Sequence, residues 1–230
     1  MKLCKNKGIA DTEKAIGWNE RRKSMSKTNG KKMDKMVLLL IPLAVAINMV
    51  AYNVIYPVTM VVIGDSIGTI LVGATCGPVA GLLVGLLSNL VNVIKNPVMI
   101  VMAPLNMAFG ALAGYMAKKG MFKKIWKTLL WTPAFGFIGG WLSGTIIFFA
   151  MGGDFWGNIA SVVLGIPMYN AGVPKYLAMA IGQLCFDCID KFVVLLVVFL
   201  VIKALPDRFL VKLPYGKYVT DAKVEEVDLD

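Results

Sequence analysis

The chain has 230 residues, of which 57% are hydrophobic and 17% are charged, and its formal net charge is +10. A soluble domain is about half apolar and about a quarter charged, so this composition and the mean hydropathy of +0.70 argue against one. They indicate a polytopic membrane protein. The chain contains no histidine, which removes the commonest metal ligand and general base. We therefore expect no bound metal and no cofactor.

The chain begins with a basic segment, residues 1–35, that holds eleven Lys or Arg against four acids. A signal peptide has a short basic region followed at once by an apolar core, which this polar segment does not match. Its composition predicts a disordered cytoplasmic tail. Basic flanks of membrane spans stay in the cytoplasm, so no nucleic-acid partner is needed to explain the charge.

Apolar stretches predict six helices, at residues 36–57, 66–75, 79–93, 98–117, 128–151 and 174–205. The second and third are short, since ten residues cover only about 15 Å of a hydrocarbon core about 30 Å thick. Broken helices of this kind are tolerated in membranes where protein or a water-filled cavity covers them.

A lysine-rich segment at residues 118–127, with five lysines and no acid, orients the spans. Six spans place this segment on the same side as the basic tail, as the positive-inside rule requires. A single kinked span over residues 66–93 would place it outside. We therefore expect an all-α membrane protein, a six-transmembrane-helix bundle with short second and third helices and both termini cytoplasmic.

The stretch between the first two long spans reads GDSIGTILVGATCGPVAGLLVGLLSNLVN, from Gly64 to Asn92. Gly77-Pro78 predicts a break between two short helices. Glycine at every fourth position from residue 73 to residue 85 predicts close helix packing. Asp65 is interpreted as a helix cap, with Ser66 as the rival capping residue.

Ionisable residues inside the spans are few, and such residues are usually paired or functional. Asp187 and Lys191 are spaced to pair along one helix face, with Asp190 nearby. They form either a structural salt bridge or part of a ligand site. The amides of the spans likewise either join helices or bind a ligand. No nucleotide-binding or hydrolase motif occurs, so an enzyme is not expected.

Two segments resemble a known family. Gly64–Asn92 is similar to the D-x-I-G-T … G-P-x-x-G-x-x-x-G-x-x-x-N stretch of the substrate-binding S components of energy-coupling factor (ECF) transporters. DKFVVLLVVFLVIKALPDRF, from Asp190 to Phe209, resembles the D-K … L-P-x-R-F ending in the same group. The resemblance covers residues 36–209 as a substrate-binding domain and leaves residues 210–230 as a cytoplasmic C-terminal tail.

The resemblance implies a subunit that captures a vitamin or related organic micronutrient at the outer face of the cell membrane. Its partners would be a transmembrane coupling subunit and two ATP-binding subunits. Family analogy puts docking on the first helix, where the A-x-x-x-A pattern is imperfect and leaves Ala44 and Ala46. The ligand is expected in the outer half, and the candidate residues there are Asn53, Asn106, Trp141, Tyr169, Asn170, Gln183 and Asp187.

Two other functions stay open on the sequence. An ion-coupled or facilitative carrier of a small organic solute would use Asp187, Asp190 and Lys191 as a relay. A non-transport membrane scaffold would bind no small molecule. The long connection at residues 152–173 is predicted to be a loop, and loops of this length often act as lids.

Overall fold

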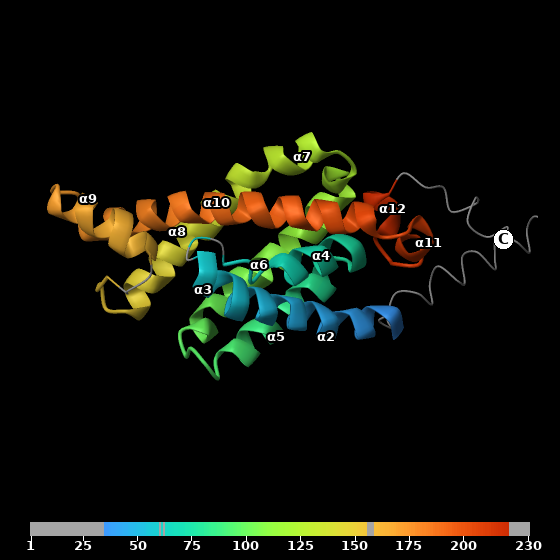
Figure 1. Ribbon diagram of the computed structural model, residues 1–230, viewed down its shortest axis with the longest axis horizontal. Coiled ribbons are helices and arrows are strands. Elements are labelled where there is room, and N and C mark those ends of the chain that lie inside the picture. Colours follow the sequence, from blue (N-terminus) through green and yellow to red (C-terminus); the bar gives the residue numbers. More distant parts are fainter. Residues whose placement is uncertain (1–34, 60, 62, 156–158, 221–230) are drawn as a thin grey trace, which may run out of the picture. The chain divides into compact units, whose positions relative to one another are not determined.

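The computed structural model describes residues 35–59, 61, 63–155 and 159–220. Every regular element in these ranges is a helix (Figure 1). The chain divides into two units, Met1–Lys35 and Met36–Asp230. The predicted disorder of the basic tail and the last ten residues of the predicted C-terminal tail lie outside the described residues.

The first helix runs without a break from Lys35 to Thr59. It consists of α2 (Lys35–Val50), the π-helical η1 (Ala51–Ile55) and α3 (Tyr56–Thr59). This agrees with the helix predicted at residues 36–57. A π-helical turn changes the direction in which the following side chains point, and such turns are frequent at functional sites.

The predicted break lies between α4 (Ile67–Cys76) and α5 (Pro78–Asn92). Gly77 adopts φ 108°, which other residues rarely adopt. The predicted close packing is also present, because a Cβ at Gly81 would lie 2.6 Å from the Gly73 Cα and 2.7 Å from the Gly110 carbonyl oxygen. Only glycine lets these backbones approach, so α4, α5 and the next helix, α6 (Met99–Lys118), form a tight unit.

The helix predicted at residues 128–151 is two helices, α7 (Ile125–Leu130) and α8 (Thr132–Ala150), preceded by the short η2 (Met121–Lys123). The interruption falls at Trp131. Pro133 explains it, because proline lacks an N–H and is compatible only with the first turn of a helix.

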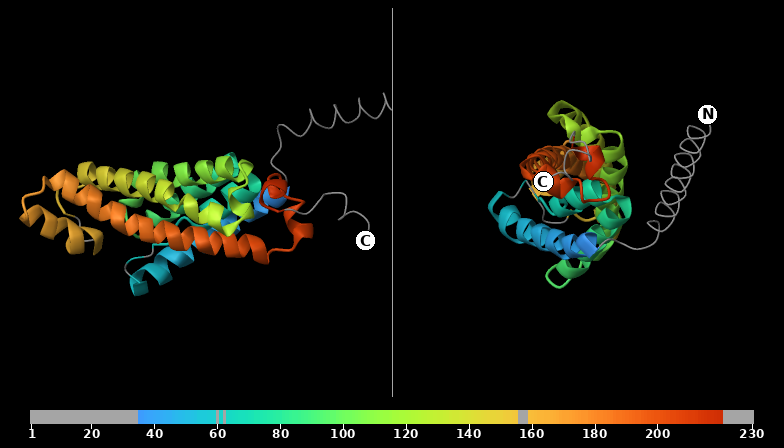
Figure 2. Two further views of the ribbon diagram at one scale, coloured as in Figure 1. Left: turned by 90° about the horizontal axis from the view of Figure 1, so that it is seen from above. Right: turned by 90° about the vertical axis from the view of Figure 1, so that its right-hand side faces the viewer.

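The longest helix is α10 (Lys175–Ala204), which packs along α8 (Figures 1 and 2). The prediction of a loop over residues 152–173 is wrong in part, since η3 (Ser161–Gly165) and α9 (Ile166–Asn170) are helical and pack on α10. Pro167 lies in the first turn of α9, where proline is tolerated.

The first part of the predicted C-terminal tail, up to residue 220, is packed against the helical bundle. α11 (Asp207–Leu210) and α12 (Gly216–Val219) follow α10 at the end remote from α9 (Figure 1). The Tyr215 N–H donates to the Thr75 carbonyl at the end of α4, at 3.0 Å. A Cβ at Gly77 would lie 2.7 Å from the Tyr215 ring. This segment therefore closes over the Gly77 break.

Three helical stretches are long and apolar enough to cross a membrane, Lys35–Thr59, Met99–Lys118 and Ile125–Ala150. The short α4 and α5 are also apolar. α10 is longer than any of them, but every 18-residue stretch of it contains Asp187, Asp190 and Lys191. Large apolar side chains such as Leu39, Val58 and Phe149 are exposed on the helix exteriors, as lipid contact would require. The count of six spans stays a prediction.

Candidate functional site

A cavity of about 340 Å³ lies inside the bundle. Its walls come from the first helix, α6, α8 and α10, and from three connecting segments. These are the connection between α3 and α4, the connection between α5 and α6, and the residues just before η3. Ligand pockets typically range from about 300 to 1,000 Å³, so this volume suits a small organic molecule.

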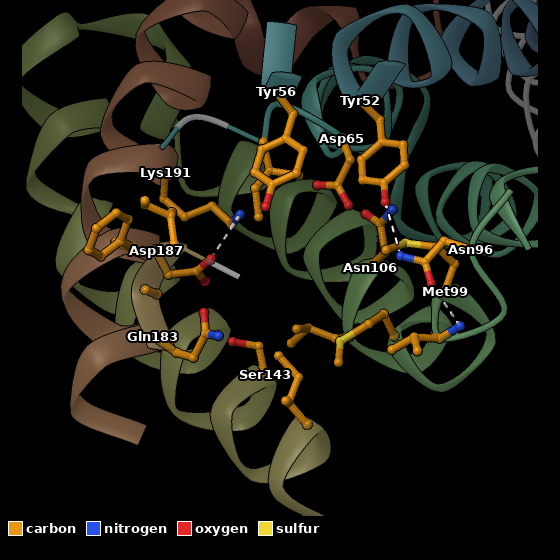
Figure 3. A pocket seen from close by; sticks show the side chains of 18 of the residues that line it. Tyr52, Tyr56, Asp65, Asn96, Met99, Asn106, Ser143, Gln183, Asp187 and Lys191 are labelled. Atoms are coloured by element: carbon orange, nitrogen blue, oxygen red, sulfur yellow. Dashed lines mark hydrogen bonds and ion pairs between the residues drawn. The ribbon is translucent and has the colours of Figure 1, made fainter. Parts of the chain in front are cut away.

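One wall is a polar face of α10 formed by Gln183, Asp187 and Lys191 (Figure 3). Residues four apart lie above one another on a helix, so these three side chains point into the same space. The Lys191 Nζ lies 3.8 Å from the Asp187 Oδ1 and 2.6 Å from the Asp190 Oδ2. It also lies 4.6 Å from the centre of the Phe109 ring, a cation–π contact.

Asp190 has a structural role that its neighbour Asp187 lacks. Its Oδ1 accepts hydrogen bonds from the backbone N–H groups of Ile63 and Gly64, at 2.8 and 2.9 Å. Its other oxygen pairs with Lys191. Asp190 therefore fastens the connection between α3 and α4 to the middle of α10, and both of its oxygens are occupied.

Polar atoms without partners gather at the cavity. Neither the Asn106 Oδ1 nor its Nδ2 has a hydrogen-bond partner in the described part of the chain, and the same holds for the Gln183 Nε2 and the Asp187 Oδ2. Asn106 is 4% exposed, and Gln183 and Asp187 are each 8% exposed. Buried polar groups are nearly always hydrogen-bonded, so these four atoms lack partners that a polar ligand or water at the cavity would have to supply.

The opposite wall carries Tyr52, Tyr56 and Asp65 (Figure 3). The tyrosine rings are stacked with an interplanar angle of 6°, and the Asn96 amide donates to the Tyr52 hydroxyl at 3.3 Å. Burial raises the pKa of Asp65, in the connection before α4, to about 6, although the nearby Lys191 acts to lower it. The cavity thus has carboxylates on two sides and aromatic rings between them.

The interpretation of Asp65 as a helix cap is wrong. The N-cap of α4 is Ser66, and it makes no side-chain capping hydrogen bond. Asp65 lines the cavity instead. A carboxylate two residues before the first residue of a helix can be taken for a cap in sequence, and only the path of the preceding connection turns Asp65 toward the cavity.

Three of the seven predicted substrate-binding residues, Asn106, Gln183 and Asp187, meet at the cavity. The other four do not line it. Asn53 donates to the Met49 carbonyl and accepts from Lys95. The remaining three lie outside: Trp141 between Phe137 and Tyr176, the exposed Tyr169 against Phe155, and the exposed Asn170 on α9.

The predicted docking alanines lie on different faces of α2. Ala44 is buried, and a Cβ at Gly68 would overlap its backbone, so it packs inside the chain. Ala46 is exposed. Ala44 is therefore unavailable to a partner, and the imperfect A-x-x-x-A pattern had mixed a packing residue with a surface residue.

Sequence reasoning missed Tyr52, Tyr56 and Ser143 as lining residues. Tyr52 and Tyr56 are four residues apart, and this spacing could have indicated that they share one face of the first helix. No group of three or more His, Cys, Asp or Glu suited to a metal ion occurs within the described residues.

Comparisons of the chain with protein-family profiles, curated proteins and solved structures find no significant match. The cavity, the helices around it and the motifs of the sequence are therefore the observations that bear on function.

Proposed function

We propose that this chain is the membrane-embedded solute-capture subunit of an importer of the ECF type. It binds a water-soluble vitamin or related organic micronutrient in the cavity and passes it inward when docked to separate ATP-hydrolysing subunits. The observation that carries this proposal is a 340 Å³ cavity lined by unpartnered buried polar atoms, inside a bundle of apolar helices.

The helices around the cavity fit this proposal. Three can cross a membrane, and the short α4 and α5 meet at a glycine turn as in the resembling motif. We propose that α10 also spans, with its buried charges shielded by the bundle. Six spans, with both termini and the lysine-rich segment around η2 in the cytoplasm, complete this topology.

The energy source is proposed to be a partner, because the sequence contains no nucleotide-binding motif. Docking is assigned to the outward face of the first helix. Ala46 lies on that face together with exposed apolar residues such as Leu39 and Leu43. Ala44 is not part of it, since it packs against Gly68.

The experiment that tests the proposal is mass spectrometry of small molecules released from the purified protein. We expect an organic solute at close to one molecule per chain. Asn106→Leu should lose it, whereas Asn170→Leu, an exposed amide on α9, should retain it. Release of no solute from the unaltered protein, under conditions where it stays folded, would contradict the proposal.

Reconstitution separates this function from a second candidate, an ion-coupled carrier. The buried Asp187, Asp190 and Lys191 favour that candidate, because carriers use such groups as relays. A capture subunit alone in liposomes should bind solute without concentrating it. Concentrative uptake by the lone chain that stops when a proton gradient is collapsed would support the carrier instead.

A further inference from the structure

The charge around the cavity is unbalanced. Three carboxylates, Asp65, Asp187 and Asp190, lie at or directly behind its walls. Lys191 is the single cation among the described lining residues. Charges buried away from water are costly unless they are compensated, so the molecule that fills this space is expected to contribute positive charge.

Lys191 does not supply the missing compensation, because it is already engaged. It is 2.6 Å from Asp190, whose other oxygen is occupied by two backbone N–H groups. Lys191 therefore carries one positive charge against Asp190 and, at 3.8 Å, against Asp187 as well. Asp187 keeps one oxygen without a hydrogen bond, and Asp65 forms no ion pair within the described residues.

The remaining groups specify shape and hydrogen bonding. Asn106 offers an unpartnered donor and an unpartnered acceptor side by side, and the Gln183 Nε2 adds a donor. The rings of Tyr52, Tyr56 and Phe109 line the same space. Aromatic rings favour flat ligands and attract cations through their faces.

We infer that the cavity selects a planar, nitrogen-rich organic cation, such as an amidine or a protonated amino-heteroaromatic ring. The cationic edge lies between Asp187 and Asp65, and a donor–acceptor edge pairs with Asn106. The same carboxylates act against an anionic ligand, which would be repelled where the cation is held. The inference rests on the proposed function only in taking the cavity to be the place where cargo binds.

The test uses three probes of one shape and different charge. Benzamidine is a planar cation, benzamide its neutral counterpart and benzoate its anionic counterpart. The full chain in detergent, freed of any retained solute, is titrated with each probe by calorimetry. We expect benzamidine to bind at least about tenfold more tightly than benzamide, a difference of about 1.4 kcal/mol, and benzoate not to bind.

Two variants assign the selectivity to its source. Asp187→Asn and Asp65→Asn should each reduce the preference for benzamidine over benzamide by about tenfold. Asp154→Asn, an exposed carboxylate outside the cavity, should leave the preference unchanged. Using two cavity variants guards against one of them failing to fold, and the ranking of probes on the unaltered chain needs neither.

Equal affinity for the three probes, tighter binding of benzoate, or no binding of benzamidine would overturn the inference. Its failure is distinguishable from failure of the proposed function. Release of a neutral or anionic solute from the purified protein refutes cation selection and leaves solute capture intact. Unaided uptake by the lone chain refutes the capture subunit, and the probe ranking still measures the charge preference of the cavity.

Discussion

Two buried asparagines, one on α2 and one on α6, have opposite surroundings. On α2, the Asn48 Nδ2 donates to the hydroxyls of Thr69 and Ser88 at 2.8 and 2.9 Å, and its Oδ1 accepts from the Gly68 N–H at 2.7 Å. On α6, Asn106 has neither amide atom paired within the described residues. Both side chains are almost fully buried. The first joins three helices, whereas the second faces a space that a ligand can fill.

The same contrast separates two carboxylates one helical turn apart on α10. Asp190 holds the backbone at Ile63 and Gly64 and pairs with Lys191, while Asp187 lines the cavity with one oxygen unpaired. Burial alone therefore does not identify a binding residue in this bundle. A binding residue is identified instead by how few hydrogen-bond and ion-pair partners its buried polar group already has within the protein.

The largest expected effect is on folding stability from Asp190→Ala. The substitution leaves the buried Lys191 with only the more distant Asp187 and removes the acceptor of two backbone N–H groups. Breaking a buried pair in this way costs about 3–5 kcal/mol. Chemical unfolding in detergent measures it, with the exposed Asp154→Ala as control. Equal stability of the two variants would remove the structural role assigned to Asp190.

The next largest effect is expected from Asn48→Ala. Truncation leaves the Gly68 N–H and the hydroxyls of Thr69 and Ser88 without the side chain that pairs with all three. We therefore expect the free energy of unfolding to fall by roughly 2–3 kcal/mol. The same unfolding experiment checks it, with Asn106→Ala as the matched amide. If Asn106→Ala proves the more destabilising, the distinction between the two asparagines is lost.

Asn106→Leu should act on binding instead of on stability. Replacing an unpartnered amide by an apolar side chain of similar size is expected to change the unfolding free energy by less than about 1 kcal/mol. Benzamidine affinity should fall about tenfold, because the ligand loses its donor and acceptor. Calorimetry measures this, and the exposed Asn170→Leu is the control. Unchanged affinity would show that Asn106 does not face the bound probe.

The smallest effect is a pH dependence of probe binding. The pKa of Asp65 is raised to about 6 by burial, so this carboxyl is charged above pH 6 and increasingly neutral below it. Its attraction for benzamidine is present at pH 7 and lost as the pH falls to 5, where about a tenth remains ionised, an effect of up to about tenfold. Asp187, Asp190 and Lys191 share this environment with Asp65. Asp65→Asn therefore isolates the contribution of Asp65, because it should remove the dependence of benzamidine affinity on pH between about 5 and 7.

Much of the fold could be predicted because the length of an apolar run and the backbone freedom of glycine are properties of neighbouring residues in the sequence. The helices at 36–57, 66–75, 79–93, 98–117 and 174–205 and the break at Gly77 follow from runs of apolar residues and from one backbone conformation. The interruption at Trp131 could have been found from Pro133. The helix within residues 152–173 was missed because Gly165 and Pro167 are residue types that, taken one by one, predict a loop.

The polar face on α10 could be predicted from one helix alone. The spacing of Gln183, Asp187 and Lys191 puts them on one face without knowledge of neighbours. Residue type does not separate Asn48 from Asn106, and only the expected depth of the ligand made Asn106 a candidate. That Asn48 is fully paired depends on Thr69 and Ser88 from other helices. Asp65 and the two tyrosines depend on the path of the connection that Asp190 fastens, which involves residues far apart in the chain.

The seating of Tyr215 over the Gly77 turn has a consequence for biosynthesis. A carbonyl at the end of α4 obtains its partner from a residue near the C-terminal end of the described chain. A ribosome releases α4 and α5 long before Tyr215 emerges. During that time the Thr75 carbonyl at the end of α4 lacks its hydrogen bond from Tyr215. A chain that stops short of Tyr215 leaves the Thr75 carbonyl without this hydrogen bond and the Gly77 turn uncovered.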